Sequence, residues 1–422
     1  MYKQQKLNNG LRVVTHNMSQ RNSIALGIMV GAGGRYEQKI IKGAAHFLEH
    51  IVFKGSRNYK CAEIKEMIEG VGGALNAFTA EEQTCFYAKI PSQHFDRTFD
   101  ILADIAFFPN INAKDVAKEK TVIVEEIKMY ADQPAHHVVD VLEKLMWGEH
   151  PLGQGLAGTA DTVMGMSRQD LCKFHQAHYA PSNAVIGIAG EIENNRILAL
   201  IKKKLSGLSV RKAPGCIPSN LEQKIARYKI SDKKTEQIHM LLGMPGLAEG
   251  HKDRYKMSIL TTILGGNMSS RLFSEVREKR GLAYSIGCSA KYLSDTGLFA
   301  VRAGVDNKKL VQAFDLIITE LRKVKKNGIS QDEFQRAKDY LVGQLLLGLE
   351  DTMDHMLWMT EWVLQQNKVK TIKEVLAEFA KITKGDIQIL AQQIIDEKKF
   401  NLALVGQVSH AQERDIREIL GI

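Results

Sequence analysis

The sequence predicts an α+β protein made of two similar tandem halves, and two observations support this prediction. The chain has 422 residues, which is more than a single hydrophobic core usually holds. It also repeats itself, because the buried strand NAVIGIAGE at 183–191 returns as NLALVGQ at 401–407,. With 44% hydrophobic and 25% charged residues, the composition is that of an ordinary globular protein,.

The first expected element is a strand, because polar and apolar residues alternate along MYKQQKLNNGLRVVTHN at 1–17,. This strand leaves no room for a signal or transit peptide, so we expect a cytoplasmic protein. No run of about 18 apolar residues occurs, and we therefore expect no membrane span,. The five cysteines are scattered and lack CxxC spacing, which indicates a reducing compartment and no cysteine metal site,.

The segment GAAHFLEHIVFKG at 43–55 contains the pattern HxxEH, formed by His46, Glu49 and His50. On a helix these side chains share one face, because residues three and four positions apart are neighbours. Two imidazoles placed in this way can hold one metal ion, and the carboxylate can take a proton from its water. The pattern is a zinc hydrolase signature in inverted order. The alternative is a chance pentapeptide whose histidines are satisfied by hydrogen bonds on a buried helix.

A glycine turn followed by β structure is expected next, in GGALNAFTAEEQTCFYAKI at 72–90,. The residues alone permit two interpretations, a hairpin beside the core and a strand that binds a ligand. Residues 86–105 indicate a strand followed by an amphipathic helix, and residues 298–321 show the same pattern,. This second pair of matching segments supports the repeat.

A helix is expected at 117–130, with the sequence AKEKTVIVEEIKMY,. Glu119 and Glu126 lie two turns apart on one side of it. A carboxylate turned toward Ile and Val is costly unless a cation receives it, so this helix is the candidate source of a third metal ligand. Glu125 is expected on a solvated face. The expected apolar face is formed by Val122, Ile123 and Ile127.

Proline and glycine interrupt the periodicity between the halves, which predicts domains at 1–212 and 227–422 with a linker at 213–226,. The second half contains no HxxEH, and its helix AKDYLVGQLLLG has no counterpart of Glu126. Only the first half is therefore expected to hold metal.

The second half instead contains MSSRLFSEVREKRGLAYSIG, with Arg277 and Tyr284 seven positions apart and ahead of a strand. Peptide hydrolysis builds an oxyanion in the transition state, and a positioned guanidinium or phenol stabilises it. Taken alone, the two residues favour a surface arginine and a core tyrosine.

These motifs make the chain similar to the pitrilysin-type zinc peptidases, the M16 family, over nearly all of its length. The similarity is greatest to short bacterial members that resemble the β subunit of the mitochondrial processing peptidase. In that family a glutamate 76 positions after the last histidine is the third zinc ligand, which corresponds to Glu126 here. The resemblance therefore implies one zinc ion per chain, held by His46, His50 and Glu126, with Glu49 as the base. A supporting glutamate seven residues earlier corresponds to Glu119.

The resemblance also implies a fold and a role for the second half. Each half should be a mainly antiparallel sheet packed with helices, of the LuxS-like metallohydrolase type. Arg277 and Tyr284 match the groups that family members aim at the substrate carbonyl.

Substrate binding is implied by the same resemblance. Asn76 and Ala77 match an edge strand that pairs with the substrate backbone. In the processing peptidases, acidic residues ten and fourteen positions past the zinc glutamate are associated with arginine near the cleavage site. Only Asp140 is kept here, and His136 stands at the other position, so a strict arginine rule is not expected.

The resulting hypothesis is a zinc-dependent metalloendopeptidase that cleaves short, extended or unfolded peptides inside a closed chamber. Long family members enclose substrate with four repeats and this chain has two, so a homodimer is expected. Two alternatives stay open: a catalytically silent scaffold subunit, and a subunit that acts only beside a paralogous M16 partner. The net charge of +9 comes from dispersed Lys and Arg, and nucleic-acid binding is not expected,.

Overall fold

The structure is a computed structural model that describes residues 2–422. The chain divides into two compact units, and neither unit is continuous in sequence. The first unit comprises Met1–Ile127, Gly155–Ile217 and Leu346–Ile372. The second comprises Lys128–Gln154, Pro218–Leu345 and Lys373–Ile422. Among the described residues, no helix combines the length and the apolar character that a membrane span needs.

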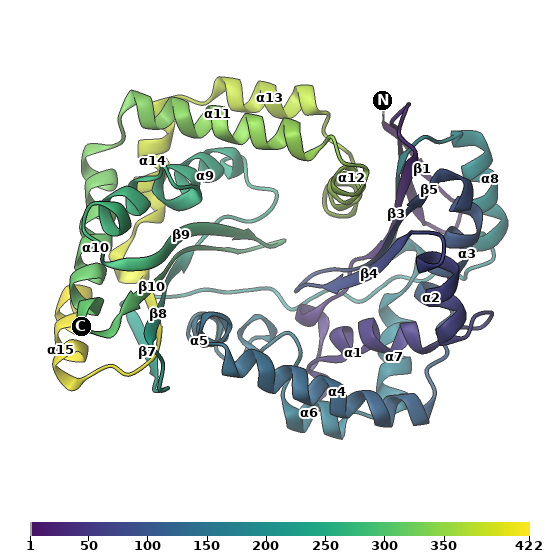
Figure 1. The fold of residues 1–422 in the computed structure, drawn as a ribbon, viewed down its shortest axis with the longest axis horizontal. Coiled ribbons are helices and arrows are strands. Elements are labelled where there is room, and N and C mark those ends of the chain that lie inside the picture. The colour runs from purple at the N-terminus through teal and green to yellow at the C-terminus, as the bar shows by residue number, and fades with distance from the viewer. Residues whose placement is uncertain (1) are drawn as a thin grey trace. The chain divides into compact units, whose positions relative to one another are not determined.

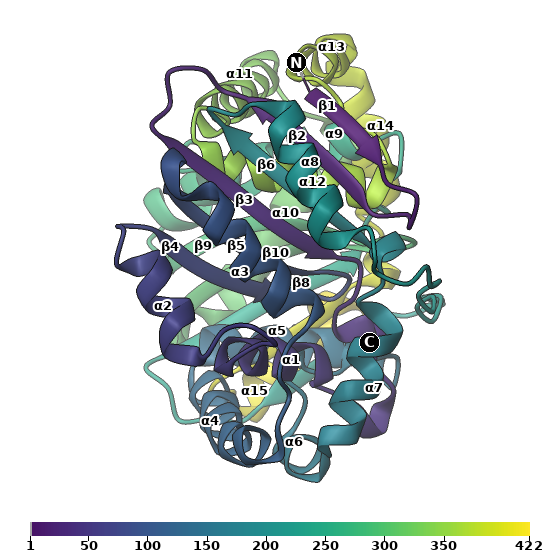
Figure 2. The same cartoon turned by 90° about the vertical axis from the view of Figure 1, so that its right-hand side faces the viewer.

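The first unit contains a six-stranded sheet (Figure 1), whose strand order β1-β2-β6-β3-β5-β4 can be followed in Figure 2. Neighbouring strands are antiparallel except β2 and β6, which are parallel. The two central strands β3 and β6 are buried along almost their whole length, which agrees with their continuous apolar sequences,. The strands are β1 Tyr2–Lys6, β2 Arg12–Asn17, β3 Ser23–Val30, β4 Ala74–Thr79, β5 Thr84–Pro91 and β6 Ala184–Gly190.

Helices cover both faces of this sheet. Figure 2 shows α3 and α8 across one face, and α12 packs against β3 and β6 on the other. The short helix α1 lies beside β4, and the long helix α4 runs on into the second unit. The helices are α1 Ala44–Ile51, α2 Cys61–Glu69, α3 Phe95–Phe107, α4 Ala113–Asp132, α6 Ala160–Gly165, α7 Arg168–His178, α8 Asn194–Leu205 and α12 Thr352–Gln366.

The second unit repeats this design in a five-stranded sheet of order β7-β11-β8-β10-β9. Its one parallel pair, β7 and β11, corresponds to β2 and β6, and all other neighbours are antiparallel. The two strands whose sequences resemble each other, β6 and β11, occupy equivalent places. The prediction of two similar α+β halves is confirmed. The strands are β7 Arg227–Ser231, β8 Gln237–Pro245, β9 Ala283–Tyr292, β10 Gly297–Asp306 and β11 Asn401–Val405.

The helices of the second unit include α5, which packs against β8 and β11. Two π-helical turns, η7 Thr262–Gly266 and η8 Phe273–Glu278, precede β9. The helices are α5 Pro134–Trp147, α9 Arg254–Thr261, α10 Leu310–Asn327, α11 Gln331–Gly348, α13 Ile372–Lys381, α14 Lys384–Ile394 and α15 His410–Leu420.

The two halves of the sequence exchange one helix. Helix α5 follows α4 in the first half and packs on the sheet of the second, while α12 follows α11 in the second half and packs on the sheet of the first. The contact of α12 is close, since a Cβ atom added at Gly187 of β6 would lie 1.7 Å from Thr360 Oγ1. Only glycine leaves room for the helix at this point. The linker predicted at 213–226 stays a prediction.

One predicted core position is wrong. Helix α4 includes the expected residues 117–130, and its Ile123 is fully buried, but Val122 is 47% exposed. The buried side of α4 is narrower than the apolar run VIV suggests, because neighbouring helical residues point about 100° apart. Glu125 is exposed, as expected.

Candidate metal centre

The HxxEH pattern lies on α1, which begins immediately after Gly43. Gly43 has a φ of 97°, and a Cβ atom there would lie 2.4 Å from the carbonyl oxygen of Ala157,. The apolar side of α1 is buried in the core and includes Phe47, Leu48 and Ile51. Its other side carries His46, Glu49 and His50, all of them half-buried. The helix therefore presents the three polar side chains of the motif together.

Helix α4 places two carboxylates against this face. His50 lies between them, with Nδ1 3.1 Å from Glu119 Oε1 and Nε2 3.2 Å from Glu126 Oε2. His46 Nε2 lies 3.6 Å from Glu126 Oε1. One ligand atom from each of His46, His50 and Glu126 lies within 4.8 Å of the others. The structure thus brings together the three residues expected to bind metal.

The donor set of this cluster fits zinc. Two imidazole nitrogens and one carboxylate oxygen make three protein ligands, and the fourth position of a tetrahedral ion stays open. The neighbouring His46, together with His50, lowers the pKa of Glu126 below its usual value. Glu126 is therefore ionised near neutral pH, which is the form that binds a cation.

Glu119 orients one of the candidate ligands. It is 3% exposed and contacts the Nδ1 atom of His50, so the Nε2 atom of that ring is directed toward Glu126. A carboxylate in this position fixes the ring and its tautomer. Lys54 Nζ lies 2.7 Å from the other oxygen of Glu119 and balances its charge. Lys54 was not predicted from the sequence, because its place four residues after His50 does not show that it meets Glu119.

The strand β4 forms one edge of its sheet and contacts α1. Asn76 is exposed on this strand, and its Oδ1 accepts a hydrogen bond from the amide of Ala77 at 2.8 Å. Ala77 is buried and lies opposite Phe86 of β5. Within the described chain β4 has one partner strand, β5, so its other edge can accept a further strand,.

Two tyrosines lie within electrostatic reach of Glu49 and were not predicted. Burial raises the pKa of Tyr87 on β5 and of Tyr179 after α7, and the negative charge of Glu49 contributes to both shifts. Tyr87 is the cross-strand neighbour of Asn76. In the sequence, the only signal for Tyr87 was that it lies in the expected β structure of 72–90.

Arg277 and Tyr284 belong to the second unit. Arg277 is exposed on η8, with its guanidinium carbon 4.8 Å from the centroid of the Phe273 ring. Tyr284 is the second residue of β9 and is 59% exposed, so the alternative of a core tyrosine is wrong. Asp140 is exposed on α5, also in the second unit.

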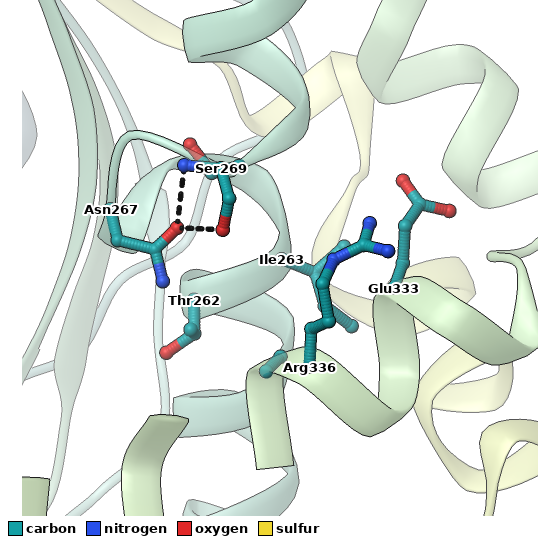
Figure 3. Close-up of a pocket in the computed structure, with 8 residues that line it drawn as sticks. Thr262, Ile263, Asn267, Ser269, Glu333 and Arg336 are labelled. Carbon is teal, nitrogen blue, oxygen red and sulfur yellow. Dashed lines mark hydrogen bonds between the residues drawn. The ribbon is translucent and has the colours of Figure 1, made fainter. Parts of the chain in front are cut away.

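The turn that leads into η8 is well ordered by its own side chains. Asn267 Oδ1 accepts hydrogen bonds from the backbone amide of Ser269 at 3.0 Å and from its hydroxyl at 2.8 Å (Figure 3). At the same end of η8, Arg271 binds Glu333 through two parallel contacts of 2.8 Å. This bidentate pair ties the segment before Arg277 to α11.

Two sequence models of known families match the chain. Residues 12–160 match the model described as "Insulinase (Peptidase family M16)". Residues 165–341 match the model described as "Peptidase M16 inactive domain". The metal cluster and the exposed tyrosine thus lie in segments matched by different models.

Curated relatives are similar over almost the full length. The chain is 36% identical over 407 residues to an uncharacterized zinc protease of Bacillus subtilis, a match that covers 96% of this chain and 98% of that protein. It is 35% identical over 409 residues to an uncharacterized zinc protease of Streptomyces coelicolor, a match that covers 96% of this chain and 89% of that protein.

Solved structures share the fold. A protease from Helicobacter pylori has a TM-score of 0.90 at 24% identity, and the match covers 96% of this chain and 99% of that one. A structure titled as a peptidase M16 inactive domain, from Pseudomonas fluorescens, has a TM-score of 0.90 at 18% identity, with 97% and 98% covered.

Proposed function

Since the chain belongs to peptidase family M16, we propose that it is a zinc-dependent endopeptidase that cleaves short, extended or unfolded peptides. The observation that carries the proposal is the convergence of His46, His50 and Glu126 within 4.8 Å, on the side of α1 that also bears Glu49. The curated relatives are named zinc proteases, which agrees with this cluster.

The residues of the cluster would have different roles in hydrolysis. His46, His50 and Glu126 would hold one zinc ion per chain and leave a position open for water. Bound zinc would polarise the scissile carbonyl and acidify that water molecule. Glu49 would take a proton from the water and later deliver it to the leaving amine. Glu119, supported by Lys54, would keep the His50 ring in the orientation that binding needs.

Substrate binding is proposed for residues on both sheets. The free edge of β4 would pair with an extended peptide backbone at Asn76 and Ala77, which favours unfolded substrates over particular sequences. Arg277 and Tyr284 would stabilise the developing oxyanion, a role supported by their exposure,. Asp140 would contribute to side-chain preference. We further propose a cytoplasmic homodimer that encloses the substrate.

A second candidate function follows from the match of 165–341 to a model named for an inactive domain. The chain could be a silent scaffold, or a subunit that needs a paralogous M16 partner. The complete cluster of His46, His50 and Glu126 favours the enzyme, because a scaffold has no use for a metal-binding set.

The test is hydrolysis of a mixed pool of unstructured peptides by the purified chain, with and without a chelator. The proposed mechanism requires cleavage that the chelator abolishes and that zinc restores. Glu49→Gln should lower kcat at least 100-fold, because it removes the general base. Glu125→Gln, one residue before the ligand Glu126 but exposed, is the matched control and should retain activity. Cleavage that survives in Glu49→Gln would refute the assigned base.

The same experiment separates the alternatives. If the wild-type chain contains zinc yet cuts no peptide, the obligate-partner subunit becomes the better description. If the wild-type chain contains no zinc even after zinc is supplied, a silent scaffold becomes the better description.

A further inference from the structure

A buried carboxylate outside the ligand set holds the beginning of the metal-bearing helix. Glu37 is 2% exposed and follows the turn Gly34–Tyr36. Its Oε2 accepts a hydrogen bond from the amide of Gly43 at 2.9 Å, and its Oε1 accepts one from the amide of Ala45 at 2.7 Å. Gly43 is the N-cap of α1 and Ala45 is its second residue. One side chain therefore satisfies two of the amides that a helix leaves unpaired at its start,.

Glu37 is paired with a lysine of the same loop. Burial raises the pKa of Glu37, and Lys42 and the amides of Ala45 and Gly43 oppose that shift. Lys42 is 5% exposed, with Nζ 3.2 Å from Glu37 Oε2, and it donates a hydrogen bond to the carbonyl of Gly34 at 2.8 Å. The hydroxyl of Thr162, on α6, donates to the backbone carbonyl of Lys42 at 2.9 Å. Since a buried ion pair without such partners is costly, this network holds the segment 34–43 in one arrangement.

The beginning of α1 determines where the metal ligands point. Helix α1 has only eight residues, too few to be stable by propensity alone,. His46 lies three residues after Gly43, in the first turn, and His50 lies in the next. Each residue advances a helix by about 100°, so a shift in the first turn rotates both imidazoles away from Glu126.

We propose that Glu37 is a positioning residue for the metal centre. Its carboxylate fixes the first turn of α1 and thereby directs the ligand nitrogens of His46 and His50 toward Glu126. It touches neither the metal nor the substrate. This inference rests on the proposed function only in that α1 carries the metal ligands.

The test compares zinc binding by wild-type protein, Glu37→Gln and a matched control. Affinity is measured by competition with a chromophoric chelator, and ligand geometry by the visible spectrum of the Co²⁺-loaded protein. Glu37→Gln should weaken zinc binding about 10-fold or more and alter the Co²⁺ spectrum, as losses in the support of metal ligands do. The control is Glu63→Gln, which changes the residue that accepts from the Lys60 amide at the start of α2, at 2.7 Å. Its affinity and spectrum should match the wild type.

An unchanged zinc affinity and Co²⁺ spectrum in folded Glu37→Gln would overturn the inference. If that variant does not fold, Glu37→Asp takes its place, because it keeps the charge opposite Lys42 but cannot reach both amides. If neither folds, hydrogen exchange of the wild type decides. Zinc must then slow exchange at the amides of Gly43 and Ala45, because coupling between two sites is reciprocal. Unchanged exchange would reject the proposal.

The outcomes distinguish this inference from the proposed function. If the chain binds zinc, shows the Glu37→Gln defect and cuts no peptide, the positioning role of Glu37 is supported, and the proposal that the chain alone is a peptidase is refuted. If the wild-type chain cuts peptides and Glu37→Gln binds zinc as tightly as the wild type, the peptidase is supported and the role of Glu37 is refuted. A wild-type chain that binds no zinc refutes both.

Discussion

His178 is a residue whose protonation should destabilise the fold. It is 5% exposed and packs against the rings of Phe174 and Tyr36, with centroid distances of 4.4 and 5.6 Å. Burial lowers the pKa of His178 to about 4. A charge on this ring would be surrounded by aromatic carbon, so the folded protein favours the neutral imidazole.

The pH dependence of stability follows from this pKa. Between about pH 6.5 and 4 the unfolded chain binds a proton at His178 that the folded chain does not, so stability rises with pH in this window. The stabilisation from neutral His178 is fully present above pH 6.5. About 3 kcal/mol of unfolding free energy is lost when the pH falls to 4. In His178→Phe the loss between pH 7 and pH 4, measured by urea unfolding, should shrink accordingly. The same substitution at the exposed His410 should not change it. An equally steep loss in both variants would contradict the assignment.

The metal centre shows which residues a sequence can reveal. The spacing of His46, Glu49 and His50 placed them on one helix face, and the structure shows that face. Glu126 was expected through resemblance, because nothing in the spacing of residues 76 positions apart indicates contact. Lys54 and Glu37 were missed, since their importance lies in which oxygen or amide they meet. Val122 was misplaced because an apolar run does not show how wide the buried side of a helix is.

At the scale of elements, the loop before α1 connects the metal helix to the edge strand. Gly34 and Arg35 donate backbone hydrogen bonds to the carbonyls of Ala80 and Glu81, in the turn after β4. The guanidinium of Arg35, which is 1% exposed, lies 2.6 Å from Glu82 Oε1. Glu82 is thus the partner of a buried arginine, which its position in the sequence does not indicate.

The Arg35–Glu82 pair should matter far more than an exposed pair. Arg35→Met leaves a carboxylate without its main partner next to the core, and we expect a loss of about 3 kcal/mol in unfolding free energy. Arg196→Met is the control, because Arg196 pairs with Asp96 at 2.5 Å where both side chains are more than half exposed. That variant should lose no more than about 1 kcal/mol. Chemical denaturation of both variants measures the difference, and equal losses would contradict it.

At the scale of the whole molecule, the exchange of α5 and α12 joins the two halves. The sheet face of the first unit is covered by Met356, Met359 and Val363 of α12, which meet Val14 and Val185. The strand repeat was predictable from sequence, but this exchange was not. An amphipathic pattern shows that a helix has a buried face and does not show which sheet covers it.

A fragment that ends at Ile217 should therefore not fold by itself. It lacks α12, so the apolar face of β3 and β6 is open to water, while α5 has lost the sheet on which it packs. We expect the fragment to bind a hydrophobic dye and to unfold without a cooperative transition, unlike the full chain. Circular dichroism during thermal unfolding measures this. A soluble fragment with a sharp transition would show that the exchanged helices are dispensable.

The reciprocal exchange of equivalent helices is the arrangement of a domain-swapped dimer contained in a single polypeptide. Two separate subunits would have to meet in solution, and their assembly would depend on dilution. Here the covalent connection supplies each sheet with its helix at an effective concentration on the order of millimolar. Folding of this chain should therefore follow first-order kinetics, with a half-time that does not depend on protein concentration.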